Sequence, residues 1–200
     1  YLMYLDYGTV DDVAQHNIGV LNNVAGDYDG AVFNNDINFV IVEQFVSTCS
    51  TCDPWTSNTA AGTLLSNFAD WGNNGGFSVS DFDLAQLWTD RNLNGSTVGI
   101  ADIGGVCSSC KYQVLQDYTT NATFLRVLTS HETGHNFGAR HNYESSDACS
   151  SPLLRGPLIM DPTVSTATDW STGFEVCVEK LNGSITEIND ELASISCLSA

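Results

Sequence analysis

Three of the four histidines in this 200-residue chain lie within eleven residues, in the run from His131 to His141 that reads HETGHNFGARH. On a helix, His131 and His135 are four residues apart and share one face, so that both imidazoles can reach one metal ion. Three histidine ligands and one open position are typical of catalytic zinc sites, whereas structural sites are closed by four protein ligands. The spacing therefore predicts that His131, His135 and His141 bind a catalytic zinc ion.

Two further residues of the run fit this chemistry. Glu132 is rotated about 100° from His131 around the helix, which places it beside the ion, where a general base can take a proton from a water molecule that the metal activates. Gly138 can end the helix in a left-handed conformation, so that the chain turns back and brings in His141. By composition alone, these residues would take these offsets with a probability on the order of 10⁻⁵ or below. His16 stands alone, and we assign no such role to it.

Charge and composition limit the partners. Acidic side chains outnumber basic ones by 24 to 6, which gives a formal net charge of −18. Nucleic acids and anionic membranes both require a basic face, so we expect neither as a partner. No apolar run approaches the roughly 18 residues of a membrane span. The content of 42% hydrophobic and 15% charged residues predicts a globular fold.

The N-terminus and the cysteines indicate a processed, secreted protein. The chain begins Tyr1-Leu2-Met3-Tyr4, without an initiator methionine or a signal-peptide pattern, so we interpret it as a piece of a longer precursor. Seven cysteines suit an oxidising setting, although a reduced protein could carry them as metal ligands. Cys49 with Cys52 and Cys107 with Cys110 have the CxxC spacing. These four thiolates could hold a structural zinc ion, or either pair could be a thiol redox motif.

The elements that must position the histidines alternate between helix and strand in the first part of the chain. Apolar spacing predicts a helix with Val13, Val20, Leu21 and Val24 on related faces, a strand over Ile37–Val42, a helix over Thr59–Trp71, a short helix over Asp81–Thr89, a strand over Val98–Ala101 and a helix from Thr120 onward. After Gly138 the chain is loop-rich to about Asp169, and an amphipathic stretch from Phe174 to Ile195 follows. We therefore expect one α/β (α+β) domain over 1–200, with an upper subdomain over 1–138 and a smaller, irregular one over 139–200.

The histidine run and its surroundings resemble the metzincin metallopeptidases. The run has the form of their extended zinc motif, and Leu158-Ile159-Met160-Asp161-Pro162, in which Met160 lies nineteen residues beyond His141, is similar to their Met-turn. The chain is most similar to the adamalysin/reprolysin branch, over approximately residues 81–162. The runs that carry this likeness are Asp83–Thr89, Asn94-Gly95, Val98–Ala101, Gly105–Cys107, Val114–Tyr118 and Gly134–Asn136.

This resemblance implies a fold and an activity, namely those of a zinc endopeptidase catalytic domain. The fold would be a twisted mixed sheet with helices, followed by a small lower part with Met160 under the zinc and a terminal helix. The loop from Pro162 to Trp170 would wall the pocket for the residue after the scissile bond. The expected partner is a protein or peptide substrate of a monomeric, secreted enzyme that a pro-segment keeps latent. The strand that pairs with this substrate would consist of Gly99, Ile100, Ala101, Asp102, Ile103, Gly104 and Gly105.

The sequence departs from the branch in two places. Asn142 follows the third histidine, where the branch usually has Asp. In the branch, the residue at this position supports the turn and does not bind zinc. Family members also bind a structural calcium ion, and Asp83 and the Cys197 carbonyl match two of its ligands. However, no acidic residue can be placed on a first strand, and Ala200 stands where an Asn is expected. Calcium therefore remains open alongside zinc.

The resemblance also implies a set of disulfides. One would tie the C-terminal helix to the α/β part, one would lie in the lower part, and one would close a local loop. In that order, the pairs are Cys107 with Cys197, Cys149 with Cys177, and Cys49 with Cys52. Cys110 would then be unpaired or bonded to a segment outside this chain.

Two functions follow from these residues. The first is a secreted zinc endopeptidase, and the alternative is a zinc-binding interaction module of the same fold that does not turn over substrate. Glu132 beside three intact ligands favours the enzyme, because a module freed from catalysis has no physical need for a general base. The net charge predicts a preference for neutral or basic substrates, although it would equally suit a saline habitat.

Overall fold

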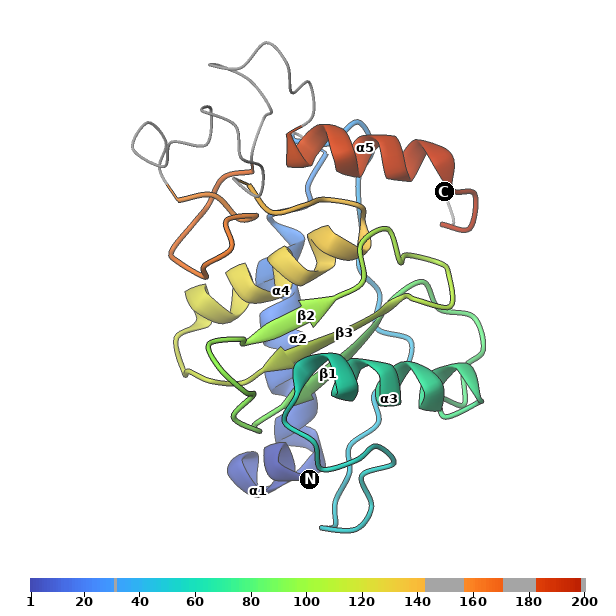
Figure 1. The fold of residues 1–200 in the computed structure, drawn as a ribbon, viewed down its shortest axis with the longest axis vertical. Helices are drawn as coiled ribbons and strands as arrows, with labels where there is room; N and C mark the ends of the chain where they lie inside the picture. Colours follow the sequence, from blue (N-terminus) through green and yellow to red (C-terminus); the bar gives the residue numbers. More distant parts are fainter. Residues whose placement is uncertain (31, 143–156, 171–182, 199–200) are drawn as a thin grey trace.

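The computed structural model describes residues 1–30, 32–142, 157–170 and 183–198 (Figure 1). Five helices and three strands occur in this part of the chain. In chain order they are α1 (Leu2–Tyr7), α2 (Val10–Ala25), α3 (Ala61–Asn73), β1 (Ala85–Thr89), β2 (Gly99–Ala101), β3 (Tyr112–Gln116), α4 (Ala122–Asn136) and α5 (Ser184–Ser194).

The three strands form one mixed sheet in the order β1-β3-β2. β1 runs parallel to β3, with Leu87 opposite Val114, and β2 runs antiparallel to β3, with Ile100 opposite the same Val114. β3 is therefore central, and β1 and β2 are the two edges among the described strands. A small mixed sheet with helices confirms the expected α+β class, while the division at residue 138 stays a prediction.

Helices cover both faces of this sheet, with α3 on one side and α2 and α4 on the other (Figure 1). Neighbouring residues of β1 point to opposite faces, so Leu87 joins the core under α3 with Phe68, whereas Trp88 packs against the core between α2 and α4. Val24 of α2 and Leu125 of α4 belong to this second core, and both are almost fully buried. The zinc-motif helix is thus fixed between the sheet and α2.

The predictions of the helix over Thr59–Trp71, the strand over Val98–Ala101 and the helix from Thr120 are confirmed, with shifts of one or two residues. α4 begins where the Asn121 side chain accepts a hydrogen bond from the backbone N–H of Thr123 at 3.0 Å, which is an N-cap. α5 lies inside the predicted amphipathic stretch, whose residues 174–182 fall outside the described part of the chain. None of the described helices is long and apolar enough to cross a membrane.

The predicted helix over Asp81–Thr89 is wrong, because residues 85–89 form β1. Burial alternates along this strand, with Ala85, Leu87 and Thr89 buried and the residues between them half-buried. Both faces of β1 are covered, so apolar residues occur on both sides and the period of two is hidden in the sequence.

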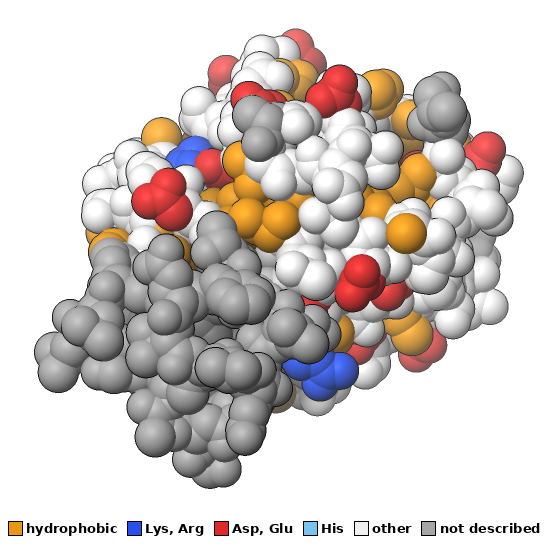
Figure 2. Space-filling view, turned by 90° about the horizontal axis from the view of Figure 1, so that it is seen from above, with side chains coloured by type: hydrophobic (Ala, Val, Ile, Leu, Met, Phe, Trp, Pro, Cys, Tyr) orange, Lys and Arg blue, Asp and Glu red, His pale blue; other side chains and the backbone are white. Residues whose placement is uncertain are grey.

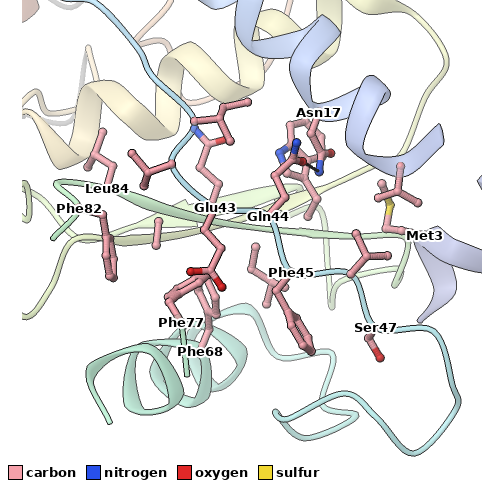
Figure 3. Close-up of a pocket in the computed structure, with 18 of the residues that line it drawn as sticks. Met3, Asn17, Glu43, Gln44, Phe45, Ser47, Phe68, Phe77, Phe82 and Leu84 are labelled. Atoms are coloured by element: carbon pink, nitrogen blue, oxygen red, sulfur yellow. Dashed lines mark hydrogen bonds between the residues drawn. The ribbon is translucent and has the colours of Figure 1, made fainter. Parts of the chain in front are cut away.

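The predicted strand over Ile37–Val42 is also wrong. These residues are not in the sheet, and Val40 is 80% exposed. Within the described residues, the backbone of 38–48 makes no backbone hydrogen bond to β1. The segment runs beside that edge strand with a cavity of about 220 Å³ between them, lined by Phe39, Phe45, Phe77 and other mostly apolar side chains (Figure 3). Residues 37–42 therefore have the composition of a strand but do not pair with another strand in the described part of the chain.

Candidate metal centre

α4 carries His131, Glu132 and His135 on its buried last two turns. The helix ends at Asn136, and Gly138 follows with a left-handed φ of 92°. The N–H of Gly138 donates to the carbonyl of His135 at 2.9 Å, which closes the helix end. The chain then reverses, as the position of this glycine predicted, and brings His141 back to the helix.

The imidazoles of the three histidines converge on one point. Nε2 of His141 lies 3.0 Å from Nε2 of His131 and 3.1 Å from Nε2 of His135. Three nitrogen atoms bound to one zinc ion at about 2.0–2.1 Å with tetrahedral angles would lie roughly 3.3 Å apart. The spacing of the three nitrogens therefore fits a zinc ion.

Hydrogen bonds to backbone carbonyls set the tautomer of the two helical histidines. Nδ1 of His131 lies 2.7 Å from the carbonyl oxygen of Ile159, and Nδ1 of His135 lies 2.8 Å from that of Ala139. A carbonyl oxygen can only accept, so each Nδ1 carries the proton and each Nε2 presents a lone pair to the shared point. Neutral imidazole nitrogens with free lone pairs are among the ligands that zinc prefers.

Burial controls the charges in the metal-free site. It lowers the pKa of His131 to about 3, an effect to which the neighbouring His135 and His141 add. It also raises the pKa of Glu132, which is 5% exposed, to about 8. Without a metal, the site therefore favours neutral imidazole and neutral carboxyl, and a bound dication would favour the carboxylate instead.

The predicted Met-turn lies directly against the zinc-motif helix. Met160 is fully buried, and a Cβ atom placed on Gly134 would lie 2.7 Å from its sulfur. Ile159, the residue before Met160, supplies the carbonyl that orients His131. The turn thus packs under the helix and fixes one of the three imidazoles.

Asn142 performs the supporting role that the branch usually gives to Asp. Its backbone N–H donates to the Met160 carbonyl at 2.8 Å, and its side-chain N–H₂ donates to the Asp161 carboxylate at 3.0 Å. The segment after His141 is therefore tied to the turn by two hydrogen bonds. The amide at this position keeps the connection without adding a further negative charge.

The predicted substrate strand is shorter than expected. Only Gly99–Ala101 pair with β3, and residues 102–105 leave the sheet and bend over the end of α4. There the N–H of Gly104 donates to the carbonyl of His135 at 2.9 Å, and the Asn136 side chain donates to the carbonyl of Asp102 at 2.9 Å. These contacts join the edge strand to the helix that carries the histidines.

Two disulfides occur in the described part of the chain, between Cys49 and Cys52 and between Cys107 and Cys197. Because all four of these sulfurs are bonded, the two CxxC pairs do not supply four thiolates for zinc, and Cys107 is not paired with Cys110. Cys110 is exposed, and among the described cysteines it alone has no disulfide. The expected pair of Cys149 with Cys177 lies outside the described residues.

Asp83 and Cys197 are brought together, as a calcium site would require. An Asp83 carboxylate oxygen lies 3.3 Å from the Cys107 sulfur, next to the disulfide. No further carboxylate joins this group among the residues that the structure describes. A single carboxylate is a weak calcium ligand set, so these residues give calcium no support beyond the sequence.

Sequence reasoning missed a buried polar network that holds the zinc-motif helix. Asp27, in the turn after α2, accepts hydrogen bonds from the Arg126 guanidinium and from the Ser130 hydroxyl, both on α4. Arg126 also donates to the carbonyl of Ala167, and the Trp170 indole donates to the carbonyl of Asp27 at 2.8 Å. The network joins three segments that are far apart in sequence, and no local motif marks it.

The apolar cavity beside β1 is separate from the metal centre. Its lining comes from residues 39–47, from α1, α2, α3 and β1, and from residues just before β1, and it includes Met3, Asn17, Glu43, Phe68 and Leu84 (Figure 3). None of the three motif histidines lines it. The candidate functional site is therefore chosen by the convergence of the three histidines and not by the position of this cavity.

Comparisons with known proteins agree with this geometry. Residues 3–172 match a reprolysin model described as metallo-peptidase family M12. The hemorrhagic metalloproteinase-disintegrin-like kaouthiagin of Naja kaouthia is 36% identical over 108 residues, which are 54% of this chain and 26% of that protein. The chain thus spans about a quarter of the length of this relative. A solved chain described as the structure of a chaperone-substrate complex matches 93% of this chain and 31% of its own length, with a TM-score of 0.56 and 16% identity, which supports the fold alone.

Proposed function

The chain belongs to metallo-peptidase family M12, and from this premise we propose that it is a zinc-dependent endopeptidase in which Glu132 is the general base. The observation that carries this proposal is the convergence of three Nε2 atoms, with the buried Glu132 next to His131 on the same helix. His131, His135 and His141 would hold the ion. Three protein ligands leave a fourth position open to substrate or water.

The reaction is hydrolysis of a peptide bond. When bound, zinc supplies Lewis acidity that polarises the scissile carbonyl and makes a water molecule more acidic. Glu132 accepts a proton from the attacking water and later returns it to the leaving amine. The carbonyls of Ile159 and Ala139 hold the first two imidazoles in the tautomer that this chemistry needs.

The substrate is a protein or peptide that lies along β2. This strand is an edge, so its outer backbone groups can pair with an extended peptide as an added strand. Residues Gly99–Ala101 provide this pairing, and residues 102–105 shape the end of the cleft. Met160 supports the site from below, and the loop from Pro162 to Trp170 walls the neighbouring pocket.

The setting is extracellular, and the enzyme acts as a monomer released from a pro-segment. Two disulfides support an oxidising compartment. The similarity to a metalloproteinase with a disintegrin-like part supports membership of a longer protein. Acidic side chains are spread over the face shown in Figure 2 and basic ones are sparse there, which fits neither nucleic acid nor anionic membranes as partners.

Cleavage of a denatured protein, with and without a zinc chelator, tests the proposed activity. The parent protein should cleave, and the chelator should stop cleavage until zinc is restored. Glu132→Gln should keep its zinc and lose activity by about 10²-fold or more, because general-base catalysis typically contributes that much. A zinc-loaded parent that binds peptides without cleaving them would identify the non-turnover module, and a Glu132→Gln variant with near-parent rates would end the general-base assignment.

A further inference from the structure

The first residue of the edge strand lies against the Glu132 side chain. A Cβ atom placed on Gly99 would lie 2.5 Å from Oε1 of Glu132 and 2.9 Å from its Cδ. The same atom would lie 2.7 Å from Cδ1 of Leu128, one turn earlier on α4. Packed interiors do not hold carbon atoms this close, so a side chain at residue 99 and the present position of Glu132 exclude each other.

Backbone conformation does not explain a glycine at this position. Gly99 pairs with Leu115 of β3 as an ordinary strand residue, and its φ is not among the left-handed values. Glycine weakens a strand interior, where it often marks a site at which another group approaches closely. Here the approaching group is the carboxyl group of Glu132.

We propose that Gly99 is a positioning residue for catalysis: its missing side chain leaves the space that the Glu132 carboxyl group occupies against the edge strand. The inference rests on the proposed function, in which Glu132 is the general base. It adds that β2 has a second role besides pairing with substrate, since its first residue sets where the base can lie.

A methyl group at residue 99 should move the base without unfolding the protein. The atoms that it would strike are the ends of two flexible side chains, Glu132 and Leu128, and not backbone atoms. Each can turn away at modest cost. The histidines are oriented by carbonyls of Ile159 and Ala139, which Gly99 does not touch, so zinc binding should persist.

The test is Gly99→Ala, compared with a parent protein first shown to be an active, zinc-loaded peptidase. The variant should keep its zinc content and thermal midpoint, and its kcat should fall about 10- to 100-fold with KM within about threefold, because a misplacement of about 1 Å can cost this much. A crystal structure of the metal-free variant should show the Glu132 carboxylate displaced, a readout that does not depend on activity.

A double-mutant cycle separates this role from a general disturbance of the strand. Glu132→Asp draws the carboxyl group back from residue 99 and leaves only the contact with the Leu128 side chain, so adding Gly99→Ala to Glu132→Asp should lower kcat less than about threefold. The proposal is overturned if Gly99→Ala leaves the carboxylate in place, if only KM rises, or if its effect on kcat is equally large in both backgrounds. An inactive parent would instead refute the proposed function.

Discussion

The two helical histidines show how single residues prepare the site for a metal. A backbone carbonyl holds the proton on Nδ1 of His131 and of His135, and burial keeps His131 neutral at physiological pH. The ligands are thus in their binding form before the ion arrives. Protons and zinc still compete for the same nitrogen atoms once the solution becomes acidic enough.

Zinc content should therefore fall as the solution is acidified. The ligand nitrogens must be unprotonated to bind, so we expect full occupancy near neutral pH and loss on the acidic side. Metal analysis after dialysis at steps from about pH 8 down to about pH 4, with Glu132→Gln as the control that keeps all three ligands, measures this loss. Zinc content independent of pH down to the unfolding transition would contradict histidine ligation.

The metal-free protein should lose stability as pH rises through the range in which Glu132 ionises. Burial raises the folded pKa from 4.5 to about 8, so the folded state keeps a proton that the unfolded state releases, and the free energy of unfolding falls with rising pH across this window. Below about pH 6.5 the lowered pKa of His131 acts in the opposite direction, because the unfolded state then binds the extra proton.

Urea unfolding of chelator-treated protein between about pH 6.5 and about pH 8 isolates the Glu132 contribution, with an expected drop of about 1–2 kcal/mol. Glu132→Gln cannot ionise and should lack the drop. An equal decline in parent and variant would assign the effect to another group.

At the scale of elements, the turn after α2, the helix α4 and the loop around Ala167 are joined by Asp27 and Arg126. The side chains of this pair are 6% and 15% exposed. Burial raises the pKa of Asp27, while Ser130 and Arg126 oppose the rise. The pair is thus a buried ionic link. Removing one partner should cost more stability than replacing both, because it leaves the other charge buried without a counter-charge.

Arg126→Met should destabilise the protein by about 3–5 kcal/mol, because it leaves a buried carboxylate without its cation. The loss should be smaller at about pH 5 than at about pH 8, since removal of the guanidinium raises the pKa of Asp27 further and lets it take a proton. Urea midpoints of Arg126→Met and of the double variant Asp27→Asn/Arg126→Met provide the measurement. A double variant no more stable than the single one would argue against the ionic link.

Elements with one buried face or a local motif could be predicted from the sequence, and the others could not. α3 buries Leu64, Leu65 and Phe68 on one face. α4 is buried at every position from Val127 to Asn136, and its prediction depends on the zinc motif and on the apolar residues of its first turns. β1 was misassigned, because burial on both faces hides its alternation, and β3, buried at all five positions, was not recognised. Gly99 could not be found from sequence, because its importance depends on a contact with Glu132 across the fold.

At the scale of the whole molecule, the net charge of −18 should steer substrates. Long-range attraction raises encounter rates for oppositely charged ligands and is screened by salt, since the Debye length is about 10 Å at 0.1 M. Cleavage of a basic peptide should therefore slow as salt rises, and cleavage of an acidic peptide should quicken. An uncharged peptide is the control, and identical salt dependence for all three would assign the charge to another role, such as solubility in saline surroundings.

The disulfide between Cys107 and Cys197 gives the molecule a covalent ring. The two cysteines are 90 residues apart, and the ring that they close contains all of α4, His141, Met160 and α5. One peptide-bond cut anywhere inside this ring leaves both products attached to each other. A protease exposed to other proteases, and to itself, can thus be nicked there and still keep its three histidines on one molecule. The nicked form would run as a single band on a gel without reductant and as two bands after reduction.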